Sequence, residues 1–219
     1  MLNTISSLPT DAGGAKNLGI LAFGSLITSP GPEIASRIVG RIKDVKTPFK
    51  VEFARKSKTR GNAPTLIPVD SGGAQVKAEI LILREDLDPD LARDMLWRRE
   101  TRQTGRQKYR RPKVIRRDDV IVETINDLSG VQTVLYVKIG SNIDNLSART
   151  LAELAIWSVR AASPSHDGIT YLIDAKQCGI ETPLTRDYES EILRQTRAKS
   201  LRGALNQLKG RNAARRVAC

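Results

Sequence analysis

The chain has 219 residues, with 36 Lys and Arg against 24 Asp and Glu, so its formal net charge is +12. This length is sufficient for one large or two small domains with a real core. The 40% content of hydrophobic residues excludes wholesale disorder. No stretch approaches the roughly 18 consecutive apolar residues of a membrane span. Residues 1–16 lack a basic start followed by an apolar run, so they do not read as a secretory signal, and we expect a flexible N-terminal segment there.

Cysteine and histidine are scarce. Cys178 and Cys219 cannot form a disulfide framework, which favours a reducing compartment and a cytoplasmic protein. His166 is the only histidine, and no spacing typical of a zinc site occurs, so we expect no metal and no other cofactor. A Ser-His-Asp triad would have to use His166 without an accompanying GxSxG elbow, whereas its surroundings indicate a polar residue near a helix start.

The positive charge is concentrated in two segments. Residues 98–117 contain ten Lys and Arg and one acid, a net of +9, and residues 196–219 contain seven and none, a net of +7. The remainder therefore carries 12 − 9 − 7 = −4. Such segments attract nucleic acid and other anions. Because aromatic residues form only 4% of the chain, a base-stacking platform is poorly supplied, and a solvated loop and a frayed tail are favoured.

Strands dominate the first part of the chain. The apolar run at 18–23 predicts a buried strand that stops at a turn at Gly24. Further strands are predicted at 38–45 and 49–53. The alternation of apolar residues at 76–82 predicts another.

A helix is inserted before the next pair of strands. Asp88 fits an N-cap and Pro89 a first helical position, which predicts a helix to about Arg102. Strands are then predicted at 120–125 and 131–139, joined as a hairpin through an Asp-Leu-Ser-Gly turn.

The last third of the chain is helical in pattern. The run TLAE at 150–153 fits a capping box, from which a helix should run until shortly before Pro164. A second helix is predicted at 168–178, with Gly179 as its C-terminal cap. A third begins after Pro183 and continues into the basic tail.

This order of elements predicts one α+β domain. We place the domain at 17–195, between the N-terminal segment at 1–16 and a basic C-terminal tail at 196–219.

Glu100 is the candidate catalytic residue. It follows Leu96 and Trp97 by one turn, at the edge of the apolar stripe of the inserted helix. Partial desolvation there favours the protonated carboxyl and suits a general acid or base. The alternative is that a neighbouring arginine pairs with it and favours its charged form. The neighbouring arginines are Arg98, Arg99 and Arg102.

A second feature is the bend after the first strand. A strand that ends in Gly24-Ser25 leaves backbone N–H groups without partners in the sheet, and such groups bind a carboxylate or an oxyanion. Gly-Ser turns are common, so the bend does not specify a function by itself. The run GGAK at 13–16 lacks the full phosphate-loop pattern, and we exclude that function.

Several motifs together resemble one family. The run LAFGSLI at 21–27 resembles the substrate loop of the gamma-glutamylcyclotransferase superfamily, whose hallmark is Tyr-Gly-Ser followed by Leu or Asn. The run LWRRE at 96–100 is similar to the Leu-x-x-Arg-Glu motif that holds its catalytic glutamate. The features that resemble the glutathione-specific branch are Arg-Gly with a following Pro at 60–64, AASPS at 161–165, Tyr-Leu at 171–172 and Gly-Ile at 179–180.

The resemblance implies a fold in which helices pack on a small mixed β-barrel or sheet. It implies release of 5-oxoproline from a γ-glutamyl compound, glutathione among the candidates, without a cofactor. Glu100 would be the acid and base, and backbone N–H groups of Gly24, Ser25 and Leu26 would hold the substrate carboxylate or oxyanion. Arg60 would contribute a positive charge toward an anionic substrate, a surface position being the alternative.

The chain departs from the family pattern at three places. Phe23 replaces the hallmark tyrosine, so a hydroxyl contact from this substrate-binding position is lost. The tyrosine expected soon after the glutamate is displaced, and Tyr109 is the nearest candidate for substrate binding. Residues 70–73 replace the usual Pro-Gly. The departures leave the substrate open.

Two other functions remain open. The same fold in a basic protein is suited to hold RNA or another anionic partner without catalysis. An enzyme of biosynthesis that handles γ-glutamyl amine acyl groups would share Glu100 but not the substrate.

Overall fold

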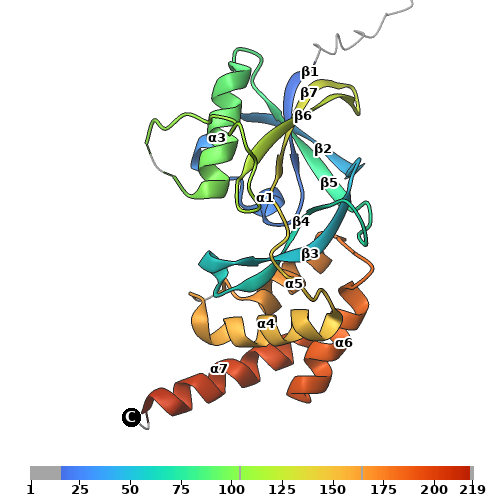
Figure 1. The fold of residues 1–219 in the computed structure, drawn as a ribbon, viewed down its shortest axis with the longest axis vertical. Helices are drawn as coiled ribbons and strands as arrows, with labels where there is room; N and C mark the ends of the chain where they lie inside the picture. The colour runs from blue at the N-terminus through green and yellow to red at the C-terminus, as the bar shows by residue number, and fades with distance from the viewer. Residues whose placement is uncertain (1–15, 104, 164, 218–219) are drawn as a thin grey trace, which may run out of the picture.

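A computed structural model describes residues 16–103, 105–163 and 165–217. The fold has three tiers, a five-stranded sheet, a two-stranded hairpin in the middle and a layer of helices on the far side of the hairpin (Figure 1). The expected N-terminal segment, apart from Lys16, lies outside the described residues, as do Pro164 and Cys219.

The larger sheet is mixed and open. Its strand order is β2-β5-β1-β7-β6, with β1 and β7 parallel and every other pair antiparallel. Because β2 and β6 are edges, no closed barrel occurs among the described residues, whereas the expected α+β class is confirmed. The five strands are β1 (Lys16–Ala22), β2 (Ile38–Lys46), β5 (Lys77–Leu83), β6 (Ile121–Leu128) and β7 (Val131–Lys138).

Strand periodicity places two faces of the sheet in different cores. Leu18 and Ile20 of β1 pack beneath α3 (Pro89–Thr101), whereas Leu21 faces the opposite side. The start of α3 is as predicted, because the Asp88 carboxylate accepts the backbone N–H of Asp90 at 2.9 Å.

The hairpin contains a strand that the sequence pattern did not indicate. β3 (Lys50–Ser57) pairs antiparallel with β4 (Ala63–Val69), and the 3-10 turn η1 (Lys58–Arg60) joins them. Pro64 and Pro68 interrupt the signal for β4, since proline cannot donate to a ladder. A two-stranded sheet tolerates them, because β4 is paired on one side only.

The helical layer packs on the hairpin. Phe53 of β3 lies edge-to-face against Tyr188, with 5.4 Å between ring centroids, and both side chains are fully buried. Leu151 and Ile169 belong to the same core. The four helices are α4 (Ala148–Ala161), α5 (Gly168–Gln177), α6 (Thr185–Thr196) and α7 (Leu201–Val217).

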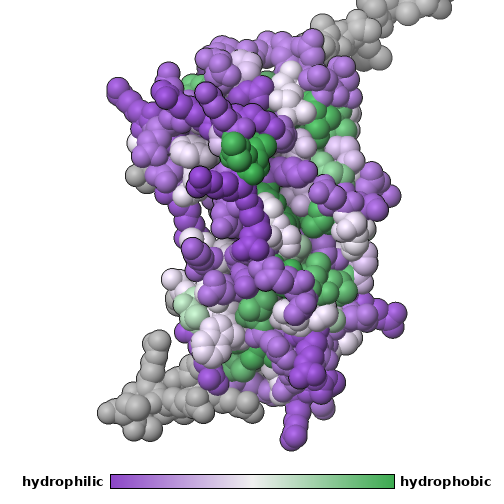
Figure 2. All heavy atoms as spheres, in the orientation of Figure 1, coloured by the Kyte–Doolittle hydropathy of each residue, from purple (hydrophilic) through white to green (hydrophobic). Residues whose placement is uncertain are grey.

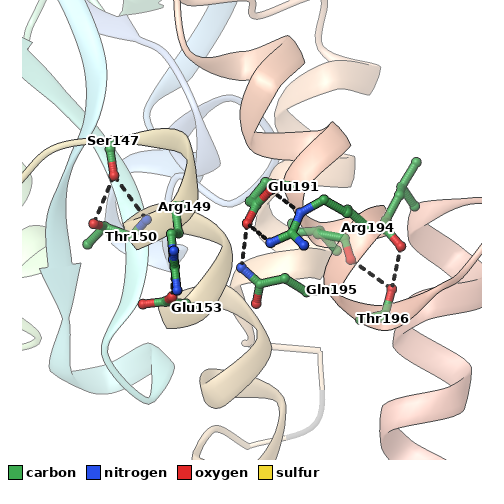
Figure 3. Close-up of polar contacts among 10 residues, drawn as sticks. Ser147, Arg149, Thr150, Glu153, Glu191, Arg194, Gln195 and Thr196 are labelled. Atoms are coloured by element: carbon green, nitrogen blue, oxygen red, sulfur yellow. Dashed lines mark hydrogen bonds and ion pairs between the residues drawn. The ribbon is translucent and has the colours of Figure 1, made fainter.

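The cap of α4 lies one turn before the predicted box. The Ser147 hydroxyl accepts the backbone N–H of Thr150 at 3.2 Å, so Ser147 is the N-cap (Figure 3). On α6, Glu191 binds the guanidinium of Arg194 at 2.7 Å and the amide of Gln195 at 2.9 Å (Figure 3). These surface contacts lie three and four residues apart and support the helix locally.

The expected basic tail is instead a packed helix. Arg197 ends α6 in the left-handed conformation, with φ of 56°, and α7 then packs against α4, α5 and α6 (Figure 1). Leu201, Ala204 and Leu208 are buried in the core of the helical layer. The packed helix at 201–217 thus lies beyond the predicted domain boundary at 195, within the segment that we expected to be a basic tail.

No helix in the described ranges is long and apolar enough to cross a membrane.

Candidate active site

A cleft of about 1410 Å³ lies between the C-terminal half of α3, the β3–β4 hairpin and the bend after β1. In the view of Figure 2, hydrophilic side chains gather on the part of the surface where α3 lies. The lining includes Phe23, Ser25, Leu26, Arg60 and Glu100, which are five of the predicted site residues. The structure thus brings together residues from distant parts of the chain.

The bend after β1 needs glycine at position 24. Gly24 has φ of 59°, and α1 (Ser25–Thr28) begins directly after it. A Cβ atom at Gly24 would lie 2.8 Å from the hydroxyl of Tyr171, so a larger residue would be strained and crowded. Next to the bend, Leu26 is buried and Phe23 lies edge-to-face on Phe49, at 5.8 Å between centroids.

Glu100 lies in the last turn of α3, and about a quarter of its side chain is exposed. Its carboxylate forms an ion pair with the guanidinium of Arg99. The same guanidinium donates to the Ser25 hydroxyl at 3.3 Å and to the Ser29 carbonyl at 2.7 Å. Arg99 therefore links Glu100 to the bend. This contact is the one expected under the alternative interpretation of Glu100, in which a neighbouring arginine pairs with its carboxylate.

Arg98 and Arg102 do not pair with Glu100. Arg98 is buried and binds Glu33 at 2.6 Å, which ties α3 to α2 (Pro32–Ala35). Arg102 is exposed at the C-cap of α3, and no carboxylate of the described residues lies within ion-pair distance of it.

Arg60 and Tyr171 form the opposite wall. The guanidinium of Arg60 lies over the Tyr171 ring, 4.8 Å from its centroid. The Tyr171 hydroxyl accepts the backbone N–H of Leu66 at 3.3 Å. Burial raises the pKa of Tyr171 and the charge of Glu100 adds to this, although the bond from Leu66 and the charge of Arg60 oppose it. The hydroxyl therefore keeps its proton at neutral pH and acts as a donor.

Sequence reasoning did not select Tyr171 or Arg99 as site residues. Tyr171 belongs to the Tyr-Leu pattern of the resemblance, and Arg99 precedes the candidate glutamate, so both lay inside motifs. The motifs did not indicate that α5 places the Tyr171 hydroxyl next to the bend after β1.

Tyr109 does not line the cleft. Its backbone N–H donates to Asp94 at 2.6 Å, its hydroxyl accepts the N–H of Val122 at 3.2 Å, and its ring lies 6.4 Å from that of Trp97. The residue thus connects α3 to β6 and lies outside the lining of the cleft.

No group of three or more His, Cys, Asp or Glu side chains within the described part of the chain is placed to hold a metal ion.

No model of a known protein family matches the sequence, and no curated protein matches it.

Proposed function

We propose that the protein is a cytoplasmic gamma-glutamylcyclotransferase-like enzyme that releases 5-oxoproline from a γ-glutamyl compound. The observation that carries the proposal is the partly buried Glu100 carboxylate, joined through Arg99 to Ser25 at the bend. Residues of four of the motifs that resemble the family, at 21–27, 60–64, 96–100 and 171–172, line one cleft, which supports the same function. The proposal includes the fold, which we assign to the gamma-glutamylcyclotransferase superfamily.

The main chemical requirement of the proposed reaction is proton transfer. The α-ammonium of the substrate loses a proton, and its nitrogen attacks the γ-carbonyl carbon to close a five-membered ring. Glu100 accepts a proton from the attacking nitrogen and delivers it to the leaving nitrogen as the C–N bond breaks. The products are 5-oxoproline and an amine, and the amine takes up from solvent the proton that the α-ammonium first released to it, so atoms and charge balance. Holding the two ends of one molecule together supplies much of the rate.

The other residues of the cleft bind and orient. The guanidinium of Arg99 and the hydroxyl of Ser25 face the position of the substrate α-carboxylate, next to the N–H groups of the bend. Tyr171 donates its hydroxyl proton to a substrate oxygen, because its own acceptor site is taken by Leu66. This hydroxyl compensates for the one that is missing at Phe23.

Replacement of the proposed acid and base tests the function. We expect Glu100→Gln to lower 5-oxoproline release by about 10²–10⁴-fold, because an amide cannot transfer the proton. The measurement is mass spectrometry of 5-oxoproline over a panel of γ-glutamyl compounds that includes glutathione. Circular dichroism of each variant shows whether the fold is kept.

Glu181→Gln is the matched control, since Glu181 is exposed and outside the cleft. The control should keep the activity of the unaltered protein. Equal turnover by Glu100→Gln, or release of no 5-oxoproline from any compound of the panel, would contradict the proposal.

A further inference from the structure

The cleft carries more positive charge than its own carboxylates neutralise. Its lining holds eight Lys and Arg side chains and three Asp and Glu side chains, an excess of five positive charges. The acids are Glu33, Glu100 and Asp118. Each of them already pairs with an arginine of the lining, at 2.6 Å for Arg98 with Glu33 and 2.9 Å for Arg55 with Asp118.

Of the five cations in excess, Arg117 pairs with Asp144 outside the lining at 3.5 Å, which leaves four. In the described ranges, no carboxylate lies within ion-pair distance of Lys56, Lys58, Arg60 or Arg102. Lys58 and Arg60 belong to η1, and Arg102 is the C-cap of α3 across the cleft. The uncompensated charge is therefore on both walls.

Positive charges from across the cleft disfavour the charged form of Arg60. Burial lowers the pKa of Arg60, and the positive charges of Arg102 and Arg99 lower it further, whereas Tyr171 and Asp174 act in the opposite direction. Cations that face one another in a partly desolvated cleft raise the free energy of the empty protein. An anion bound between them removes that cost.

The cleft is also larger than a γ-glutamyl group requires. Pockets for small ligands usually measure about 300–1,000 Å³, and this one measures about 1410 Å³. With the γ-glutamyl part at Ser25, Arg99 and Glu100, room remains along η1 for the part of the substrate that leaves.

We propose that the leaving portion of the substrate is an acidic amine with two or more negative charges, bound between η1 and Arg102. The substrate class is then γ-glutamyl compounds of acidic peptides. This inference rests on the proposed function for the bond that breaks, but the binding of the acidic portion is measurable without turnover.

The experiment uses four peptides whose leaving portions carry none, one, two and three carboxylates. They are γ-glutamyl-alanine amide, γ-glutamyl-alanine, γ-glutamyl-glutamate and γ-glutamyl-glutamyl-glutamate. We expect kcat/KM to rise by about tenfold with each added carboxylate, since each one forms a hydrogen bond between charged groups with a cation of the lining. The values for the acidic peptides should fall as salt is added.

Two double variants locate the effect. Lys58→Gln with Arg102→Gln should reduce the ratio of kcat/KM between the most acidic and the neutral peptide by at least about tenfold. Arg110→Gln with Lys113→Gln removes the same charge from exposed positions outside the cleft, and that ratio should persist.

The outcomes separate the two proposals. Equal kcat/KM for all four peptides, with 5-oxoproline released from each, overturns the inference and leaves the proposed function standing. Calorimetry with Glu100→Gln measures binding alone, so graded affinity without turnover by the unaltered protein supports the acidic subsite and overturns the proposed function. Salt-dependent binding of single-stranded RNA, with no preference among the peptides, overturns the inference.

Discussion

Gly24 and Tyr171 show how single atoms shape the cleft. Gly24 lies in the bend after β1, whereas Tyr171 comes from α5 in the helical layer, and the tyrosine hydroxyl lies 2.8 Å from where a Cβ atom at position 24 would be. The same hydroxyl binds the backbone of Leu66 in β4. This oxygen atom of the helical layer therefore binds the hairpin and limits the size of the residue at the bend.

The two residues should interact in a double-mutant cycle. Gly24→Ala introduces a side chain at positive φ and against the hydroxyl, and should cost about 1–3 kcal/mol of unfolding free energy. Tyr171→Phe leaves the buried N–H of Leu66 without an acceptor, at about 1–3 kcal/mol. The double variant should be more stable than the sum predicts, because removal of the hydroxyl relieves the crowding. Urea unfolding measures each free energy, and additive effects would contradict the contact.

At the scale of elements, a buried carboxylate joins the hairpin to the helical layer. Glu52 of β3 is fully buried and accepts the backbone N–H of Phe53 at 2.7 Å and the hydroxyl of Thr182 at 2.7 Å. It also accepts the N–H of Leu184, directly before α6, at 3.3 Å. Burial raises the pKa of Glu52, and these three hydrogen bonds oppose the rise only in part.

The raised pKa makes a prediction about stability and pH. In the window above the ordinary value of 4.5, the folded protein binds more protons at Glu52 than the unfolded chain does. The contribution of Glu52 to stability should therefore be greatest at acid pH and be lost as pH rises through this window. Urea unfolding from pH 4 to 8 should show the Glu52→Gln variant gaining stability relative to the unaltered protein. A difference that is constant with pH, as expected for Glu181→Gln, would refute the assignment.

At the scale of the whole molecule, α7 is part of the core and not an appendage. Its buried residues Leu201 and Leu208 pack with α4, α5 and α6. The helical layer in turn supports the hairpin and places Tyr171 at the cleft. The C-terminal helix therefore contributes to the site without contacting it.

Truncation of one buried side chain of α7 tests this arrangement. We expect Leu201→Ala to cost about 2–4 kcal/mol, because it leaves a cavity, and to lower Tm by several degrees. The exposed neighbour Arg202 provides the control, since Arg202→Ala should change stability by less than about 0.5 kcal/mol. Calorimetry measures both variants. Equal stability of the two would mean that α7 is the loose tail expected from its charge.

Local patterns were sufficient for elements whose cause is local. The apolar run of β1, the alternation in β5, the Asp88 cap of α3 and the turn between β6 and β7 each depend on residues a few positions apart. Glu100 was identifiable for the same reason, because its place follows from the spacing of α3. The sequence pattern did not indicate β4, because Pro64 and Pro68 interrupt the strand signal. Its pairing with β3 explains why these residues form a strand.

Composition misled in a different way. Seven basic residues and no acid made the end of the chain resemble a solvated tail, yet Leu201, Ala204 and Leu208 lie on the buried side of α7. Tyr109 was chosen because it is near Glu100 in the chain, but its hydrogen bonds direct it to β6.

Most of the longer helices and strands, and the position of the candidate glutamate on α3, thus followed from short-range backbone preferences and side-chain periodicity. The cleft did not, because its walls come from positions 25, 60, 99 and 171, which no spacing relates to one another. Packing of α5 against the hairpin chose Tyr171, and the pairing of Arg98 with Glu33 left Arg99 for Glu100. These pairings depend on which residues, distant in the sequence, are buried together in one interface. Only the tertiary structure determines that arrangement.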